Sequence, residues 1–195
     1  MRKLVLQIQM SVDGFIADNN GRSGWMLWNW GEVWGWDKAL QQYHIDLSAS
    51  VDCVVLSRKM AEEGFIRHWK SVAEANNDQA RFAASITAAH KVVFTNTLKQ
   101  SVWENTVLAK GDLTYEINNL KAQTGRNIIA YGGASFASAL VQANLVDEFH
   151  LVINPALVGQ GLSVFNTIPT IHMLSLIDSK AYPCGVVVTT YAAKR

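Results

Sequence analysis

Short apolar runs of strand length recur along the chain. Each is rich in β-branched residues and is bounded by turn-forming or charged residues, which is typical of a β-strand. In the first run, Gln7 and Gln9 alternate with apolar neighbours at the two-residue period of a strand. The pattern predicts six strands: Leu4–Met10, Cys53–Leu56, Lys91–Phe94, Asn127–Tyr131, Glu148–Ile153 and Gly185–Tyr191.

Three longer segments place apolar residues three and four positions apart, the spacing of one helix face. They predict helices over Asp37–Leu47, Asn77–Ala89 and Ser135–Leu145. Strands that alternate with helices indicate a mostly parallel sheet covered on both faces. After Asp147 the chain runs strand, loop, strand, so we expect the sheet to end in antiparallel strands. The prediction is an α/β fold with a single mixed, mostly parallel sheet flanked by helices on both faces.

Composition supports one large domain over residues 1–195. Of these residues, 49% are hydrophobic and 17% are charged, which provides a sizeable core and excludes a disordered chain. The formal net charge of +1 leaves no electrostatic footprint for nucleic acid or for an acidic membrane surface. No stretch approaches the ~20 apolar residues of a membrane helix, and Asp13 interrupts the first apolar run. We therefore expect a cytoplasmic protein with no nucleic-acid or membrane partner.

Cysteines and histidines give no metal-binding pattern. Cys53 and Cys184 are far apart within apolar runs, which favours buried, reduced thiols. The five histidines have no partner at ligand spacing, so no metal site is expected.

The segment Ile128–Ser135 is the first candidate for ligand binding, because a buried strand there runs into two glycines and then opens a helix. Gly132 and Gly133 permit positive φ angles and lack the Cβ atoms that would block a ligand. A helix N-terminus offers free N–H groups and partial positive charge to a phosphate, and Ser135 adds a hydroxyl. The alternative is a tight turn with an ordinary serine cap. A third glycine is missing, which points away from a Rossmann dinucleotide fingerprint.

Two further strands end in polar residues. The strand Cys53–Leu56 leads into Ser57, Arg58 and Lys59, and an arginine there can grip a phosphate with two hydrogen bonds. The strand Lys91–Phe94 leads into Thr95 and Asn96, whose hydroxyl and amide suit a ribose phosphate. The alternatives are a solvated cation pair at a helix start and ordinary turn chemistry.

The ordered set of motifs resembles the dihydrofolate-reductase-like family, in the branch of the reductase domain of bacterial riboflavin biosynthesis. The resemblance covers nearly the whole chain in the correct order. It is carried by Ser11–Ala17, Leu56–Lys59, Val92–Leu98, Gly132–Ser135, Leu145–Glu148 and Pro155-x-x-x-Gly159-x-Gly161 with Phe165. The family folds as a single mixed sheet with flanking helices and uses NADPH.

The resemblance implies a set of NADPH contacts. Gly132, Gly133, Ala134 and Ser135 would hold the pyrophosphate. Ser57, Arg58, Lys59, Thr95 and Asn96 would hold the adenosine ribose and its 2′-phosphate, and backbone groups around Gln9, Ile16 and Ala17 would meet the nicotinamide carboxamide. The chain departs from the branch at Ser57, where glycine is usual, and at Met60-Ala61-Glu62, where Thr-Tyr-Glu is frequent.

A tryptophan-rich segment follows the first strand. Five of the seven tryptophans lie between Trp25 and Trp36. In the family this segment borders the substrate site, so Trp25 and Trp28 are candidates for an aromatic wall against a planar heterocycle. The alternative is a loop folded down as a hydrophobic lid or as a dimer contact.

Reduction of C=N or C=O also requires a proton. Asp37 is favoured as the acid over Glu32, because Asp37 lies nearer the predicted helix start. Val33 stands at the position where true dihydrofolate reductases carry a carboxylate. These features predict an NADPH-dependent reductase acting on a planar, pterin- or dihydrofolate-like heterocycle or on a ribosylamino-pyrimidine. The alternative is a non-catalytic NADP(H)- or pterin-binding protein. The apolar late strands predict a homodimer.

Overall fold

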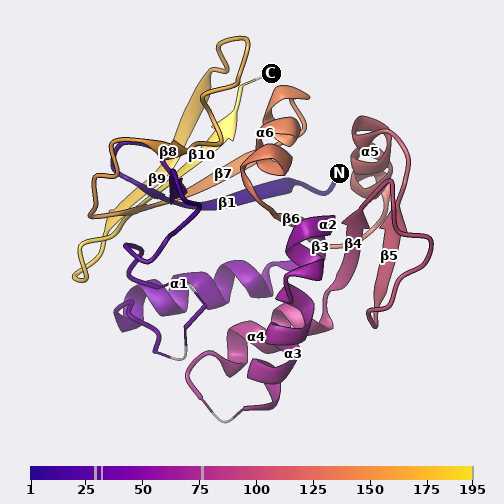
Figure 1. Ribbon diagram of the computed structural model, residues 1–195, viewed down its shortest axis with the longest axis horizontal. Coiled ribbons are helices and arrows are strands. Elements are labelled where there is room, and N and C mark those ends of the chain that lie inside the picture. Colours follow the sequence, from indigo (N-terminus) through magenta and orange to yellow (C-terminus); the bar gives the residue numbers. More distant parts are fainter. Residues whose placement is uncertain (29, 32, 76, 195) are drawn as a thin grey trace.

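The computed structural model describes residues 1–28, 30–31, 33–75 and 77–194. Its main element is an eight-stranded sheet with the order β5-β4-β3-β6-β1-β7-β10-β9 (Figure 1). The strands are β1 Leu4–Ser11, β3 Val51–Ser57, β4 His90–Phe94, β5 Thr106–Ala109, β6 Asn127–Tyr131, β7 Glu148–Asn154, β9 Leu174–Ala181 and β10 Val187–Ala193. The six from β5 to β7 are parallel, whereas β10 runs antiparallel to β7 and to β9.

Helices cover both faces of this sheet. They are α1 Lys38–Ala49, α2 Arg58–Glu62, α3 Phe65–Glu74, α4 Ala80–Ala88, α5 Leu113–Ala122 and α6 Ala134–Gln142. In Figure 1, α1, α3 and α4 lie below the sheet and α5 and α6 lie above it. Alternate residues of β1 feed two cores: Val5 packs on the α1–α3–α4 side, and Leu4 and Leu6 pack on the α5–α6 side. The predicted fold class is confirmed.

The predicted elements all have counterparts in the structure. The six predicted strands correspond to β1, β3, β4, β6, β7 and β10, and the three predicted helices correspond to α1, α4 and α6. The late strands do end the sheet in antiparallel pairing, but this begins only at β10, because β7 is parallel to β1. In the described part of the chain, no helix combines the length and apolar character needed to cross a bilayer.

A gap opens beside the middle of the sheet. Strand β1 pairs with β6 only from Leu4 to Leu6, whereas its pairing with β7 continues to Ser11. Strand β6 ends at Tyr131, where the chain turns into α6. The second half of β1 therefore presents one unpaired edge at the carboxyl ends of the strands, which is where open α/β sheets bind ligands.

Candidate functional site

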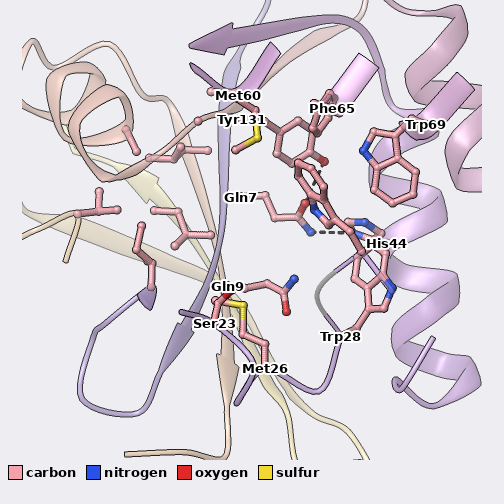
Figure 2. Close-up of a pocket in the computed structure, with 18 of the residues that line it drawn as sticks. Gln7, Gln9, Ser23, Met26, Trp28, His44, Met60, Phe65, Trp69 and Tyr131 are labelled. Carbon is pink, nitrogen blue, oxygen red and sulfur yellow. Dashed lines mark hydrogen bonds between the residues drawn. The ribbon is translucent and has the colours of Figure 1, made fainter. Parts of the chain in front are cut away.

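A cavity of about 210 Å³ occupies this gap. Figure 2 shows Gln7 and Gln9 projecting from β1 to the same side, toward His44 and Trp28. The other labelled lining residues are Ser23, Met26, Met60, Phe65, Trp69 and Tyr131. The cavity thus lies between the edge of β1, the end of β6 and an aromatic wall on the α1–α3–α4 side.

A chain of three polar side chains crosses the cavity. The Tyr131 hydroxyl donates to Gln7 Oε1 over 3.1 Å, and Gln7 Nε2 donates to His44 Nδ1 over 2.8 Å. His44 Nδ1 is then an acceptor, so the ring proton sits on Nε2, which has no hydrogen-bond partner among the described residues. Burial lowers the pKa of His44 to about 3, and it also raises the pKa of Tyr131. At neutral pH the imidazole is uncharged and the phenol keeps its proton.

Gln9 is the second amide on this face of β1. Its Oε1 atom is buried without a hydrogen-bond partner among the described residues. Leaving a buried acceptor unpaired costs about 1–3 kcal/mol, so this atom is well suited to receive a ligand N–H. The sequence indicated backbone contacts near Gln9 and gave no role to its side chain or to Gln7. The signal was two polar residues at alternate positions in a central strand.

The tryptophan-rich segment is folded into the core. Gln41 Nε2 donates to the Trp36 carbonyl over 2.6 Å and lies 3.3 Å from the Trp34 carbonyl. A Cβ atom on Gly35 would lie 2.1 Å from the Leu27 carbonyl oxygen, so only glycine allows the segment to cross itself there.

Trp28 and Trp25 have different environments. Trp28 is 3% exposed and lines the cavity. Its ring lies 4.8 Å from Trp36 and 5.9 Å from Trp69, between centroids. Trp25 is half-buried and does not line the cavity. Of the two tryptophans proposed from the sequence, the structure places Trp28 in the lining of the cavity and Trp25 outside it.

The two glycines before α6 have different surroundings. A Cβ on Gly132 would lie 2.5 Å from Phe136 Cδ1, so this glycine makes room for a neighbouring side chain. A Cβ on Gly133 would meet nothing within 4 Å, and Gly133 is the N-cap residue of α6 without a side-chain cap. Neither glycine has a positive φ, so the conformational argument made from the sequence was wrong here. The open approach lies at Gly133, next to Ala134 and the exposed Ser135.

The three predicted strand ends are neighbours in space. Ser57 pairs with Phe94, the residue before Thr95, and Leu56 pairs with Tyr131, the residue before Gly132. Parallel pairing therefore brings the three turns to one edge of the sheet, as a shared dinucleotide site requires.

The side chains at the first two turns already have protein partners. Ser57 Oγ caps α2 by accepting from Met60 N. Arg58 pairs with Glu62 over 2.6 Å, and Lys59 lies 3.6 Å from Glu63 Oε1. All four charged groups are substantially exposed, so these pairs are weak and can exchange for a ligand.

The Thr95 hydroxyl is committed to its own turn, because it accepts from the backbone N–H groups of Thr97 and Leu98. Asn96 is exposed. The sequence therefore located these polar groups correctly at the sheet edge, and the structure gives Thr95 a local structural role there.

Ile16 and Ala17 follow the carboxyl end of β1. Ile16 lines the cavity, and Ala17 belongs to a small ladder between β2 (Ala17–Asp18) and β8 (Gly161–Leu162). A Cβ on Gly161 would lie 2.0 Å from the Ala17 carbonyl oxygen, so glycine permits this pairing.

Asp37 is the N-cap of α1. One carboxylate oxygen accepts from Ala39 N and Leu40 N, and the other accepts from Cys184 N over 3.2 Å. Desolvation raises the pKa of Asp37, but these hydrogen bonds outweigh it and the pKa is lowered. Asp37 does not line the cavity and is ionised at neutral pH, which argues against its expected role as proton donor. The other candidate acid, Glu32, lies outside the described residues.

Replacing Asp37 with alanine is expected to lower the free energy of unfolding by about 1 kcal/mol, because a cap is lost. Asn can still accept from Ala39 N and Leu40 N, but its Nδ2 cannot accept from Cys184 N, so Asp37→Asn should fall between the wild type and the alanine variant. The lowered pKa means that the wild-type advantage over Asp37→Asn is present above about pH 4 and fades as the pH falls through the folded-state value. Urea unfolding at several pH values measures this. An alanine variant of unchanged stability would contradict the capping role.

Among the described residues, no group of three or more His, Cys, Asp or Glu side chains is placed to hold a metal ion.

Comparison with known proteins gives one family match. The model of the RibD C-terminal domain matches residues 2–188. The chain is 25% identical over 193 residues to YyaP of Bacillus subtilis, covering 97% of this chain and 94% of YyaP. It is also 25% identical over 181 residues to YwjB of the same organism, covering 93% and 92%. Both relatives are described as uncharacterized.

Solved structures share the fold. A protein from Shewanella sp. PV-4, provisionally described as a riboflavin biosynthesis protein, aligns with a TM-score of 0.71 at 22% identity over 99% of both chains. A pyrimidine reductase-like protein from Corynebacterium diphtheriae has a TM-score of 0.63 at 15% identity, covering 100% of this chain and 92% of that one. The diaminohydroxyphosphoribosylaminopyrimidine deaminase/5-amino-6-(5-phosphoribosylamino)uracil reductase of Thermotoga maritima has a TM-score of 0.66 at 15% identity, and this chain spans 57% of it.

Proposed function

The chain belongs to the RibD C-terminal domain family, and from this premise we propose that it is an NADPH-dependent reductase of a small planar heterocycle. The observation that carries the proposal is the open N-terminus of α6 at Gly133, beside a cavity rich in aromatic and amide groups. A dinucleotide that lies along this edge would place its pyrophosphate at the helix and its nicotinamide ring in the cavity.

The residues present fit NADPH. The first N–H groups of α6 lack intrahelical acceptors, and an added side chain at Gly133 would point into open space. Exposed Arg58 lies after the neighbouring strand β3, where it can exchange Glu62 for a 2′-phosphate. Ile16 and the backbone near Gln9 form the rim expected to receive the carboxamide.

Bound NADPH supplies a hydride, and the protein supplies position and a proton. The aromatic wall at Trp28 and Trp69 holds a flat ring and excludes water. His44 and Tyr131 fix the Gln7 amide from both ends, so the amide keeps one orientation. With Asp37 occupied as a cap, the Tyr131 hydroxyl is a described lining group that carries a proton at neutral pH. Because burial raises its pKa, it would give up this proton only to a strongly basic oxygen or nitrogen created by the hydride transfer.

The second candidate is a non-catalytic NADP(H)- or heterocycle-binding protein. It is favoured by one observation: no carboxylate belongs to the described residues that line the cavity. Single-turnover measurement of bound NADPH against dihydropterin and ribosylamino-pyrimidine substrates separates the two. Binding without oxidation of NADPH would support the non-catalytic protein.

NADPH is expected to quench tryptophan fluorescence when it binds, since tryptophans line the cavity.

Arg58→Ala should weaken the binding of NADPH much more than the binding of NADH. Loss of a hydrogen bond to a charged group costs about 1.5–3 kcal/mol, a roughly ten- to hundredfold loss of affinity. Arg67→Ala removes an exposed cation from the neighbouring helix α3 and is the matched control. Absence of quenching at high NADPH would rule out the cofactor, and equal losses for NADPH and NADH would exclude the 2′-phosphate role of Arg58.

We also propose that the protein is a homodimer that pairs through its late strands. On β9, Leu176 is 60% exposed and Ile177 is 53% exposed, and Met173 just before it is 61% exposed. Apolar side chains gathered on an edge strand are usually covered by a partner. Light scattering should give a molecular mass of twice one chain for the wild type. The Leu176→Glu variant should have the mass of a single chain. A monomeric wild-type mass would overturn the dimer.

A further inference from the structure

The described residues that line the cavity include no Lys, Arg, Asp or Glu. Their polar groups are amides, indoles, hydroxyls and the uncharged imidazole of His44. The two residues of the tryptophan-rich segment outside the described part are Asn29 and Glu32, and neither brings a positive charge. A phosphate or carboxylate in this cavity would have no cation to pair with.

Five residues that line the cavity each carry a buried polar atom without a hydrogen-bond partner among the described residues. The atoms are Gln9 Oε1, His44 Nε2 and the indole Nε1 atoms of Trp28, Trp36 and Trp69. With the tautomer set by Gln7, four of these atoms are N–H donors and one is an acceptor. Such a set is satisfied by a neutral ring that carries carbonyl or ring-nitrogen acceptors and at least one N–H.

The size of the cavity limits the ligand to a small ring system. Pockets for drug-sized ligands range over roughly 300–1,000 Å³, and this cavity measures about 210 Å³. Part of that space, beside Ile16, is assigned to the nicotinamide. The volume left for a substrate is therefore close to that of one flat heterocycle against the tryptophans.

We propose that the substrate is an uncharged lactam heterocycle, with a carbonyl next to a ring N–H, and that the cavity rejects phosphorylated derivatives of such rings. Three observations support this proposal: the described cavity lining has no charged side chain, most of the unpartnered atoms are donors, and the cavity is small. The inference rests on the proposed reductase function and deepens it. The phosphate-binding features nearby, the α6 N-terminus and Arg58, are assigned to the cofactor and are not available to the substrate.

Two matched ligand pairs test the proposal with the whole protein. They are 7,8-dihydroneopterin and its phosphate, and 5-amino-6-ribosylaminouracil and its 5′-phosphate. Affinity is measured by tryptophan fluorescence with saturating NADP⁺, and turnover is measured by the loss of NADPH absorbance. In at least one pair the unphosphorylated ligand should bind at least about tenfold more tightly, because a buried phosphate without a cation is strongly disfavoured. Equal or tighter binding of the phosphates, or no binding of any of the four, would overturn the proposal.

A variant tests the ring contact separately. Gln9→Leu keeps the size of the side chain and removes the unpartnered acceptor. It should lower the affinity for the unphosphorylated ligand about tenfold or more. Gln42→Leu, at an exposed glutamine of α1, is the matched control and should leave that affinity unchanged. NADPH affinity, titrated without substrate, should be the same in both variants. Lost NADPH affinity in Gln9→Leu would assign the amide to the cofactor, whereas absent NADPH binding in the wild type would instead defeat the reductase function.

Discussion

Replacing Trp28 with alanine is expected to lower the free energy of unfolding by about 3–5 kcal/mol, the range for large aromatic residues truncated in a packed core. Trp28 is 3% exposed and lies in ring contact with Trp34, Trp36, His44, Trp69 and Phe82. A void at this point would remove contacts from all of these rings at once. For a chain of this length, such a loss corresponds to a fall in the melting temperature of about 6–20 °C.

Urea and thermal unfolding measure this effect, and Trp25→Ala provides the matched control. Trp25 belongs to the same segment but is half-buried and does not line the cavity, so its loss should cost clearly less. The comparison also distinguishes the roles considered for the segment. If residues 25–36 formed a detachable lid or a contact between subunits, truncating Trp28 would leave the unfolding free energy of one subunit almost unchanged.

The sequence predicted the central strands well because they are buried on both faces and read as continuous apolar runs. It missed β9, which is exposed along most of its length and whose large apolar residues stop at Ile177, before Asp178 and Lys180. Strand β5 was missed because it has only four residues at the sheet edge. Helix α3 did carry a signal, with Phe65, Trp69 and Val72 at helical spacing, and could have been predicted.

At the site, the sequence identified the polar turns that follow the strands. It missed the side-chain hydrogen bonds between residues that are far apart along the chain. The turns at Ser57, Thr95 and Gly132 each follow a parallel strand, so their common edge follows from topology. By contrast, the contacts of Gln7 with Tyr131 and His44 join residues 124 and 37 positions apart. Asp37 was located correctly at the start of α1, but its three backbone hydrogen bonds, one of them from distant Cys184, became visible only in the fold.

The stability of the protein should fall as the pH is lowered below 6.5, with His44 as a major cause. The pKa of His44 is about 3 in the folded protein, because burial disfavours the charged ring, against about 6.5 for a solvent-exposed histidine. The unfolded state therefore binds more protons between these two values. The stability that comes from an uncharged His44 is fully present above about pH 6.5 and is lost as the pH falls toward 3. At 1.36 kcal/mol per pKa unit, the full effect approaches about 5 kcal/mol.

Comparison of wild type with His44→Gln isolates this contribution, because glutamine does not titrate. The variant should be less stable at pH 7, since it loses the stacking of His44 on Phe82, whose ring centroids lie 4.2 Å apart. Between pH 6.5 and 5 the wild type should lose roughly 1–2 kcal/mol more than the variant. His68 and His150 also have lowered pKa values and remain in both proteins, so their effect cancels in the difference. Parallel stability curves, or titration of His44 near 6.5 followed by NMR, would show that the imidazole is not held uncharged in the cavity.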